Sequence, residues 1–157
     1  MTIARKLKNF MDNSGISYDI LPHDREVVTS KIAQTAHISG DALAKGVLLK
    51  SDQGYLMAVV PASRNVDLAG LSHQLQERLG LATDEETQKI FDDCDPGAVP
   101  PCGVAYGMPM IIDEELDQMD DIYMEAGDHT SLIHMNGTGF ARLTAEAKHA
   151  TGISVLQ

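Results

Sequence analysis

The chain has 157 residues, 43% of them hydrophobic, which is enough for one domain with a real core and no need of disulfides. No apolar run approaches the ~20 residues of a membrane span, and the N-terminus lacks the apolar centre of a signal peptide. We therefore expect a single cytoplasmic domain over residues 1–157, without a membrane partner.

The formal net charge of −11 argues against a general affinity for DNA or RNA. The charge is uneven, because residues 1–80 hold nine Lys and Arg against eight Asp and Glu, whereas residues 81–157 hold three against fifteen. An anionic partner is therefore expected to approach the N-terminal half, and DNA is not expected as a partner.

In the first half of the chain, apolar residues at helical spacing and a closing Gly15 predict an amphipathic helix at the start. A second short helix follows an alternating strand that ends at Pro22, and two apolar β-type runs joined by "SDQG" form the clearest hairpin. In order, the predicted elements are a helix over 3–15, a strand over 16–21, a helix over 29–40 and a hairpin of 45–50 with 55–61.

In the second half, a helix ended by Gly80 precedes a helix that begins with a capping box formed by Thr83 and Glu86. Strands joined by short turns, with helices between some of them, favour an α+β fold over a doubly wound parallel sheet. We expect a mixed, largely antiparallel and barrel-like sheet flanked by helices. The predicted elements are helices over 67–80 and 83–91, strands over 108–113, 121–127 and 131–137, and a last helix around 144–152.

The segment "DDCDPGAVPPCG", residues 92–103, combines three Pro with two Gly and contains both cysteines. Pro restricts the backbone and Gly lets it turn left-handed or approach another molecule, so we expect a stiff loop with accessible backbone, or only a linker. Cys94 and Cys102 match neither a disulfide framework nor a CxxC site, and we interpret them as free thiols.

Several residues are candidates for chemistry. Lys45 begins the first hairpin strand without an acidic neighbour, so it either extends to solvent or meets a phosphate. His134 lies in an apolar strand, where a histidine is usually structural. His129, His134 and Asp113 lack zinc-motif spacing, and GxSxG, P-loop and GxGxxG motifs are absent from the sequence, so we expect no metal and no cofactor.

Four segments in this order, "LAKGVLLK", "GYLMAVVPASRNVDLAGL", "DPGAVPPCGVAYGMPMIID" and "YMEAGDHTSLIHM", resemble the YbaK-like aminoacyl-tRNA deacylases and the editing domain inserted in prolyl-tRNA synthetase. The likeness covers nearly the whole chain. Its most specific elements are the hairpin Lys, the GxxxP loop, the Asp after the next strand and the AG turn. The chain departs from the family where many relatives have Thr in place of Gly46 and a Phe near Cys102, which bears on the size of the pocket.

The resemblance implies roles for six residues. Lys45 would meet the phosphate and ribose of the tRNA acceptor end, and the GxxxP loop, Gly97 to Pro101, would hold backbone amides at Gly97 and Ala98 around the aminoacyl ester. The catalytic residues implied by the family are Lys45, Gly97 and Asp113, and the substrate-binding residues are Ala98, Pro101 and His134, the last of which helps to shape the amino-acid pocket.

The function that the resemblance implies is a free-standing trans-editing hydrolase that deacylates mischarged aminoacyl-tRNA, with Ala-tRNA(Pro) or Cys-tRNA(Pro) as the expected substrate. Water, oriented by the substrate's terminal ribose hydroxyl, would attack the ester. The expected partners are the tRNA acceptor end and an aminoacyl-tRNA synthetase. Two alternatives stay open: a non-catalytic aminoacyl- or nucleotide-binding module that docks on a synthetase, and a hydrolase that uses Cys94 or Cys102.

Overall fold

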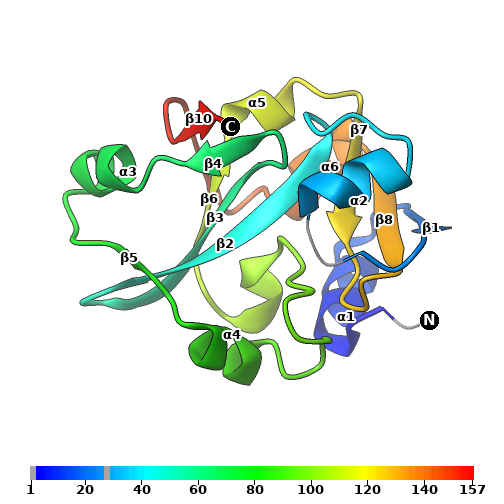
Figure 1. Ribbon diagram of the computed structural model, residues 1–157, viewed down its shortest axis with the longest axis horizontal. Helices are drawn as coiled ribbons and strands as arrows, with labels where there is room; N and C mark the ends of the chain where they lie inside the picture. Colours follow the sequence, from blue (N-terminus) through cyan, green and yellow to red (C-terminus); the bar gives the residue numbers. More distant parts are fainter. Residues whose placement is uncertain (1–2, 27–28) are drawn as a thin grey trace.

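A mixed sheet forms the centre of the structure, a computed structural model that describes residues 3–26 and 29–157 (Figure 1). Neighbouring strands are parallel in the pairs β2–β7, β3–β6 and β6–β9 and antiparallel in the other pairs. The expected α+β fold with a mixed, largely antiparallel sheet is confirmed. In spatial order the strands are β1 (Asp19–Pro22), β8 (Ser131–Asn136), β7 (Asp121–Glu125), β2 (Leu43–Ser51), β3 (Gly54–Pro61), β6 (Met110–Asp113) and β9 (Lys148–Ala150).

Two further short strand pairings lie outside this order. β5 (Gly80–Leu81) pairs with the C-terminal end of β2, at Leu49 and Lys50, whereas β7 pairs with its N-terminal end. β10 (Ser154–Leu156) pairs with β4 (Arg64–Val66) in a separate two-stranded sheet. The middle of β2 is therefore paired with β3 on one edge, while its other edge has strands only at the two ends.

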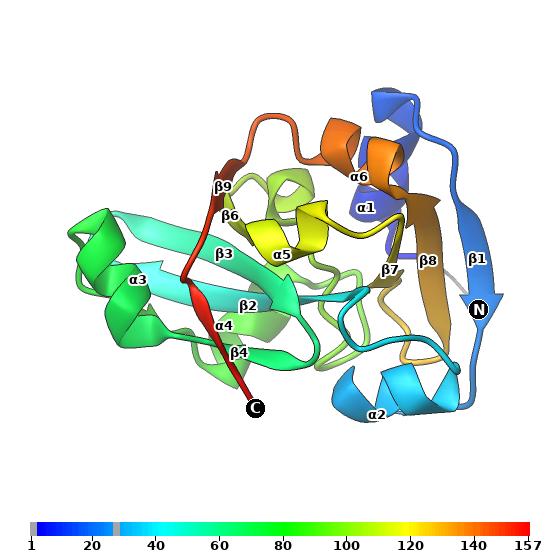
Figure 2. The same cartoon turned by 90° about the horizontal axis from the view of Figure 1, so that it is seen from above.

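The helices cover both faces of the sheet. Side chains of α1 and α6 pack in one core cluster with alternate residues of β7 and β8, while α2 packs against the opposite face of these strands. Figure 2 shows α3 beside the β2–β3 hairpin, where its Leu71 joins a second cluster. The helices are α1 (Arg5–Ser14), α2 (Thr29–Thr35), α3 (Leu68–Leu75), α4 (Asp84–Ile90), the 3-10 turn η1 (Gly103–Tyr106), α5 (Glu114–Asp117) and α6 (Gly137–Leu143).

Strand β3 is buried on both faces. Met57 and Val59 lie in the cluster that contains α1 and α6, whereas Leu56, Ala58 and Val60 lie in the cluster that contains α3. Successive side chains of a strand point to opposite faces, so a strand between two cores has to be apolar at every position. This explains the continuous apolar run of "YLMAVV" and the confirmed hairpin prediction.

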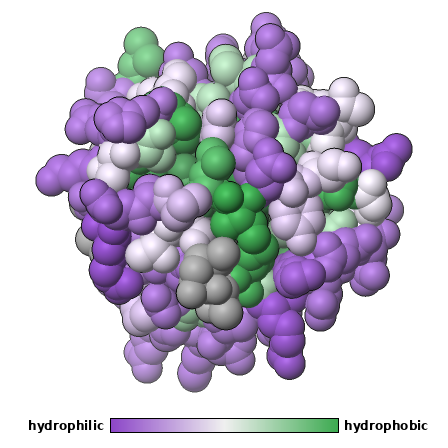
Figure 3. All heavy atoms as spheres, turned by 90° about the vertical axis from the view of Figure 1, so that its right-hand side faces the viewer, coloured by the Kyte–Doolittle hydropathy of each residue, from purple (hydrophilic) through white to green (hydrophobic). Residues whose placement is uncertain are grey.

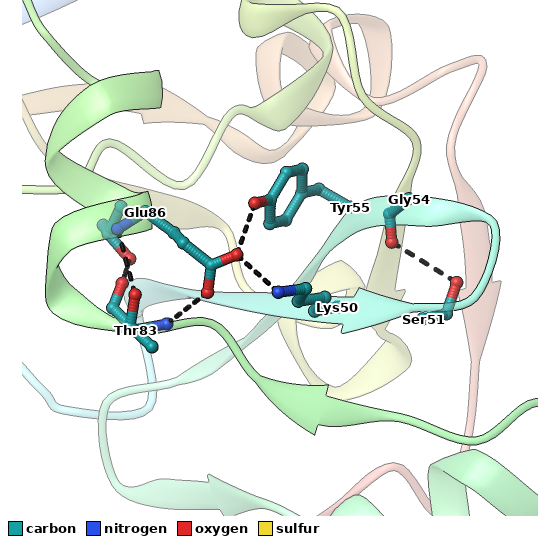
Figure 4. Close-up of polar contacts among 7 residues, drawn as sticks. Lys50, Ser51, Gly54, Tyr55, Thr83 and Glu86 are labelled. Carbon is teal, nitrogen blue, oxygen red and sulfur yellow. Dashed lines mark hydrogen bonds and ion pairs between the residues drawn. The ribbon is translucent and has the colours of Figure 1, made fainter.

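The capping box predicted at the start of α4 is present and also joins α4 to the hairpin (Figure 4). The Glu86 carboxylate accepts the Thr83 N–H (3.0 Å), the Tyr55 hydroxyl (2.5 Å) and the Lys50 ammonium (2.7 Å). Tyr55 and Lys50 lie on β3 and β2. Since α4 leads directly into residues 92–103, these bonds fix the start of that loop relative to the hairpin.

Three helix predictions differ from the structure, and in one of them the helix expected over 29–40 ends at Thr35. No helix forms at 144–152: the last helix is α6, seven residues earlier, where Asn136 caps the Gly139 N–H and Phe140 and Leu143 are buried. Burial and the cap outweigh the helix propensity of "TAEAKHA", three residues of which pair with β6 instead. The helix expected to end at Gly80 ends at Leu75, with Gln76 as its cap, because residues 80–81 pair with β2.

The face of the molecule nearest β1 is mostly hydrophilic, with a hydrophobic band through its middle (Figure 3). Over residues 3–26 and 29–157, no helix combines the length and the apolar composition needed to cross a membrane.

Acidification is expected to weaken the link between α4 and the hairpin. The hydrogen bond from Lys50, with those from Thr83 and Tyr55, lowers the pKa of Glu86 from 4.5 to about 2. A lowered folded-state pKa stabilises the fold above the unfolded value and loses that effect as pH falls through the folded value. Glu86→Gln should therefore lower the melting temperature near neutral pH, and the difference from the wild type should shrink as pH falls from about 4.5 toward about 2.

Glu85→Gln is the matched control, since Glu85 is exposed in the same first turn of α4 and takes no part in the capping box. Equal melting-temperature losses for the two variants at every pH would contradict the role assigned to Glu86.

Candidate functional site

A small cavity of about 80 Å³ lies between β2, α2, the end of β7 and the loop 92–103. It brings together two of the residues predicted from the sequence, Lys45 and Gly97. A larger cavity of about 320 Å³ beside the tip of the hairpin contains none of them. The residues that line the small cavity are Ile32, Leu43, Ala44, Lys45, Gly46, Gly97, Val99 and Glu125.

In the part of the chain that the structure describes, the ammonium group of Lys45 is bound by neutral groups alone. It donates to the backbone carbonyl of Arg64 (2.7 Å) and to Oδ1 of Asn65 (3.4 Å), both on β4. Burial lowers the pKa of Lys45, since no carboxylate compensates its charge. A half-buried ammonium without an anionic partner can take a negatively charged group of a ligand.

The loop is held by hydrogen bonds to the β7–β8 turn. The Asp95 N–H donates to the Gly127 carbonyl (2.8 Å) and the Nε2 of His129 contacts the Pro96 carbonyl at 2.6 Å. A carbonyl only accepts, so Nε2 of His129 carries the proton and donates it. His129 is buried and its φ is +61°, so the turn presents its imidazole to the loop.

Gly97 follows directly and supplies a backbone donor. Its φ is +80°, a left-handed conformation that residues with a Cβ rarely adopt. Among the described residues, its N–H has no hydrogen-bond partner. An unpaired amide beside a cavity can stabilise negative charge on a ligand oxygen.

Ala98 differs from the prediction. Its N–H is not bare, because it donates to the Asp95 carbonyl (3.0 Å) and closes a tight turn around Pro96 and Gly97. Ala98 itself is fully buried. The expected pair of free amides is therefore reduced to the one at Gly97.

Pro101 does not line the cavity but lies against β2 at Gly46, which does. A Cβ built on Gly46 would lie 3.0 Å from the Cα of Pro101 and 2.9 Å from the sulfur of Met57. Residue 46 has to be glycine for the loop to approach β2 this closely. The sequence difference at Gly46 thus has a structural reason: the loop occupies the space that a side chain would take.

Asp113 lies elsewhere in the fold. Its buried carboxylate accepts the Glu115 N–H (3.0 Å) at the start of α5 and a short hydrogen bond from the Ser154 hydroxyl. Ser154 also accepts from the Arg64 guanidinium (2.7 Å), so Asp113 is connected to β4 through Ser154. Asp113 does not line the cavity.

His134 is not brought to the cavity either. Its imidazole lies between Asp121 (2.8 Å) and Asp19 (3.2 Å) and stacks on Tyr123. The hydrogen bond to Asp121 raises its pKa. Of the two neighbouring histidines, it is His129 that contacts the loop.

Glu125 is the site residue that sequence reasoning missed. It ends β7, is 8% exposed and lines the cavity, and its carboxyl accepts the His129 N–H. Burial, together with the Asp128 carboxylate, raises its pKa to about 7. The available signal was an acidic residue inside the apolar run "IYMEAG", directly before the AG turn.

Neither cysteine is poised as a nucleophile. Cys94 and Cys102 are free, as expected, and burial raises the pKa of each thiol to about 12, so both are protonated near neutral pH. Within the part of the chain that the structure describes, three or more metal-ligating side chains do not cluster.

The raised pKa of Glu125 should make the fold less stable as pH rises. The folded state holds a proton that the unfolded chain releases near 4.5, so stability falls between that pH and about 7. Glu125→Gln removes this dependence. Its free energy of unfolding, relative to the wild type, should increase by up to roughly 3 kcal/mol between about pH 4.5 and about pH 8, measured by urea denaturation.

The exposed Glu146→Gln is the control, since it should change stability by nearly the same amount at both pH values. A pH-independent difference between wild type and Glu125→Gln would refute the raised pKa.

Solved structures with this fold are found at low sequence identity. Hypothetical protein APE2540 aligns with a TM-score of 0.83 at 16% identity, over 96% of this chain and 100% of that one. A candidate trans-editing enzyme for prolyl tRNA synthetase aligns with a TM-score of 0.80 at 20% identity, over 94% of each chain. A candidate signal transduction protein from Marinobacter aquaeolei VT8 aligns with a TM-score of 0.78 at 20% identity, over 96% of this chain and 30% of that one.

These similarities establish the fold alone. A search of curated proteins finds no match to the chain. The model of one family, the aminoacyl-tRNA editing domain, matches residues 24–143, which is more than half of the sequence and includes Lys45, Gly97 and Glu125. The chain therefore belongs to the aminoacyl-tRNA editing domain family.

Proposed function

We propose that this protein hydrolyses the ester of mischarged aminoacyl-tRNA, with alanine on the tRNA for proline as the substrate. Lys45 binds a phosphate or the ribose of the acceptor end, and the cavity receives the aminoacyl group. The observation that carries the proposal is the pairing, in one cavity, of an ammonium without an anionic partner and a backbone amide without an acceptor.

The chemistry needs no nucleophilic side chain. Water, oriented by the terminal ribose hydroxyl of the substrate, adds to the ester carbonyl carbon, and the N–H of Gly97 donates to the oxygen that becomes negative. The bond between the carbonyl carbon and the ribose oxygen then breaks, the ribose oxygen takes up a proton, and the free amino acid leaves. The protonated thiols of Cys94 and Cys102 argue against the cysteine route.

The volume of the cavity favours a small amino acid. At about 80 Å³, the cavity is much smaller than the cavities of about 320 Å³ and 290 Å³ elsewhere in the fold. An alanyl group suits such a volume better than a prolyl ring. A synthetase rejects a smaller apolar substrate by only about 10- to 200-fold, so a second site that hydrolyses the smaller product improves fidelity.

The other site residues take supporting roles in this proposal. His129 holds Pro96 and thereby the orientation of Gly97, and Pro101 packs the loop against β2 at Gly46. Asp113 acts at a distance, by fixing Ser154 and the β4 segment that binds Lys45. His134 has no role in the reaction, since its imidazole is bound by two carboxylates outside the cavity.

A deacylation panel tests the proposal. The protein at micromolar concentration should release alanine from Ala-tRNA(Pro), release cysteine from Cys-tRNA(Pro) less efficiently and leave Pro-tRNA(Pro) intact. Release is measured as loss of radiolabelled amino acid from the tRNA. Ligand-dependent thermal stabilisation without any loss of ester would instead identify a binding module and refute the hydrolase.

Substitutions of Lys45 and Gly97 should affect different steps, substrate binding in the first case and ester hydrolysis in the second. Lys45→Ala removes a charge-assisted contact and should lower kcat/KM about ten- to a hundred-fold. Gly97→Ala forces a Cβ into a left-handed backbone and displaces the donor, so kcat should fall by about 10² to 10³. Single-turnover and steady-state deacylation kinetics measure both effects.

Two matched variants isolate these effects. Gly107 has a φ of +78°, close to that of Gly97, and open space around its Cβ position, so Gly107→Ala carries similar backbone strain away from the cavity. Lys89→Ala removes the same charge from α4. Equal losses of activity in Gly97→Ala and Gly107→Ala would show that the loop 92–103 is only a linker and takes no part in the reaction.

A further inference from the structure

The cavity contains an acidic group that the proposed reaction does not use. Glu125 is more than nine-tenths buried, and its Oε1 has no hydrogen-bond partner among residues 3–26 and 29–157. Among the described residues, the backbone N–H of His129 is the donor that acts on the carboxyl. A buried carboxyl oxygen without a donor is costly in an empty site, and a ligand that supplies a donor relieves that cost.

The two charged residues of the cavity do not neutralise each other. Lys45 donates to a carbonyl and an amide oxygen on β4, and Glu125 lies on β7, with Asp128 and the His129 N–H as its polar neighbours. The side chain that α2 contributes to the cavity, Ile32, is apolar. The cavity thus carries one uncompensated cation and one uncompensated acid, contributed by different strands.

A ligand that matches this arrangement has a cationic donor at one end and an anion at the other. The aminoacylated end of a tRNA has both, since the amino acid carries an α-ammonium group and the nucleotide carries a phosphodiester. Because Lys45 on β2 is assigned to the phosphate or ribose, Glu125 on β7 is the group that can bind the α-ammonium group. Charge-assisted hydrogen bonds of this kind are about twice as strong as neutral ones.

Resting on the proposed function, we propose that Glu125 binds the α-ammonium group of the aminoacyl ester, so that the site accepts esters of free α-amino acids and rejects esters whose α-nitrogen is acylated or absent. Peptidyl and N-acylated aminoacyl esters would lose this contact and place a bulky group against a buried carboxyl. Glu125 is then a specificity-determining residue that touches the substrate. The raised pKa of Glu125 is consistent with a group that ionises fully when a cation binds beside it.

The test uses probes that cannot be hydrolysed, adenosine 5′-phosphate derivatives with an amide in place of the 3′ ester. One carries alanine, the second carries lactic acid, which replaces the amino group by a hydroxyl, and the third carries N-acetylalanine. Calorimetry should show that the wild type binds the alanyl probe about ten- to a hundred-fold more tightly than either of the others. In Glu125→Gln this preference should fall toward one, while Glu146→Gln should keep it.

Three results would overturn the inference: equal affinity of the wild type for the alanyl and lactyl probes, an unchanged preference in Glu125→Gln, or no binding of the alanyl probe at millimolar concentration. If the variant does not fold, equal affinity of the wild type for the alanyl and lactyl probes still overturns the inference. Failure of the proposed function is seen separately, in the deacylation panel. A protein that binds the alanyl probe through Glu125 but hydrolyses no ester would refute the hydrolase and keep the ammonium site.

Discussion

The hydrogen bonds between the loop 92–103 and the β7–β8 turn create the site. The bond from the Ala98 N–H to the Asp95 carbonyl closes the turn in which Gly97 is left-handed, and the bonds from Asp95 to the Gly127 carbonyl and from His129 to the Pro96 carbonyl hold that turn beside the cavity. Glu125 ends β7, directly before this turn, so the two bonds place the backbone donor and the acid beside the same cavity. The opposite wall is the hairpin strand β2, whose Gly46 lets the loop approach.

The acidic composition of the second half of the chain has a structural explanation at several positions. Asp93 accepts the Lys6 N–H (2.9 Å) and the Tyr106 hydroxyl (2.7 Å), Glu86 joins α4 to the hairpin, and Asp113 caps α5. Each of these carboxylates accepts hydrogen bonds from N–H or O–H donors within the protein. A cationic partner is not needed to account for them.

The sequence was most informative where one local rule decides the structure. The hairpin, the Gly15 cap and the Thr83 capping box were predicted correctly, because the turn, the cap and the alternation involve neighbours in the chain. The last helix was misplaced because the burial of Phe140 and the pairing of β9 with β6 depend on distant segments. For the same reason Asp113 and His134 were grouped with the site although neither lines the cavity, and Glu125 was overlooked although it does.

Some paired strands are far apart in the sequence, which affects how the chain folds. Asp19 of β1 pairs with His134 of β8, and Arg64 of β4 pairs with Leu156 of β10. Both partners appear long after the first strand has been synthesised, at about 5–20 residues per second on the ribosome. The hairpin can form early, but the walls around it close only when the C-terminal third is available. Contacts between such distant segments slow folding. The nascent N-terminal half therefore exposes apolar strand edges for several seconds, and during that time it has to avoid aggregation.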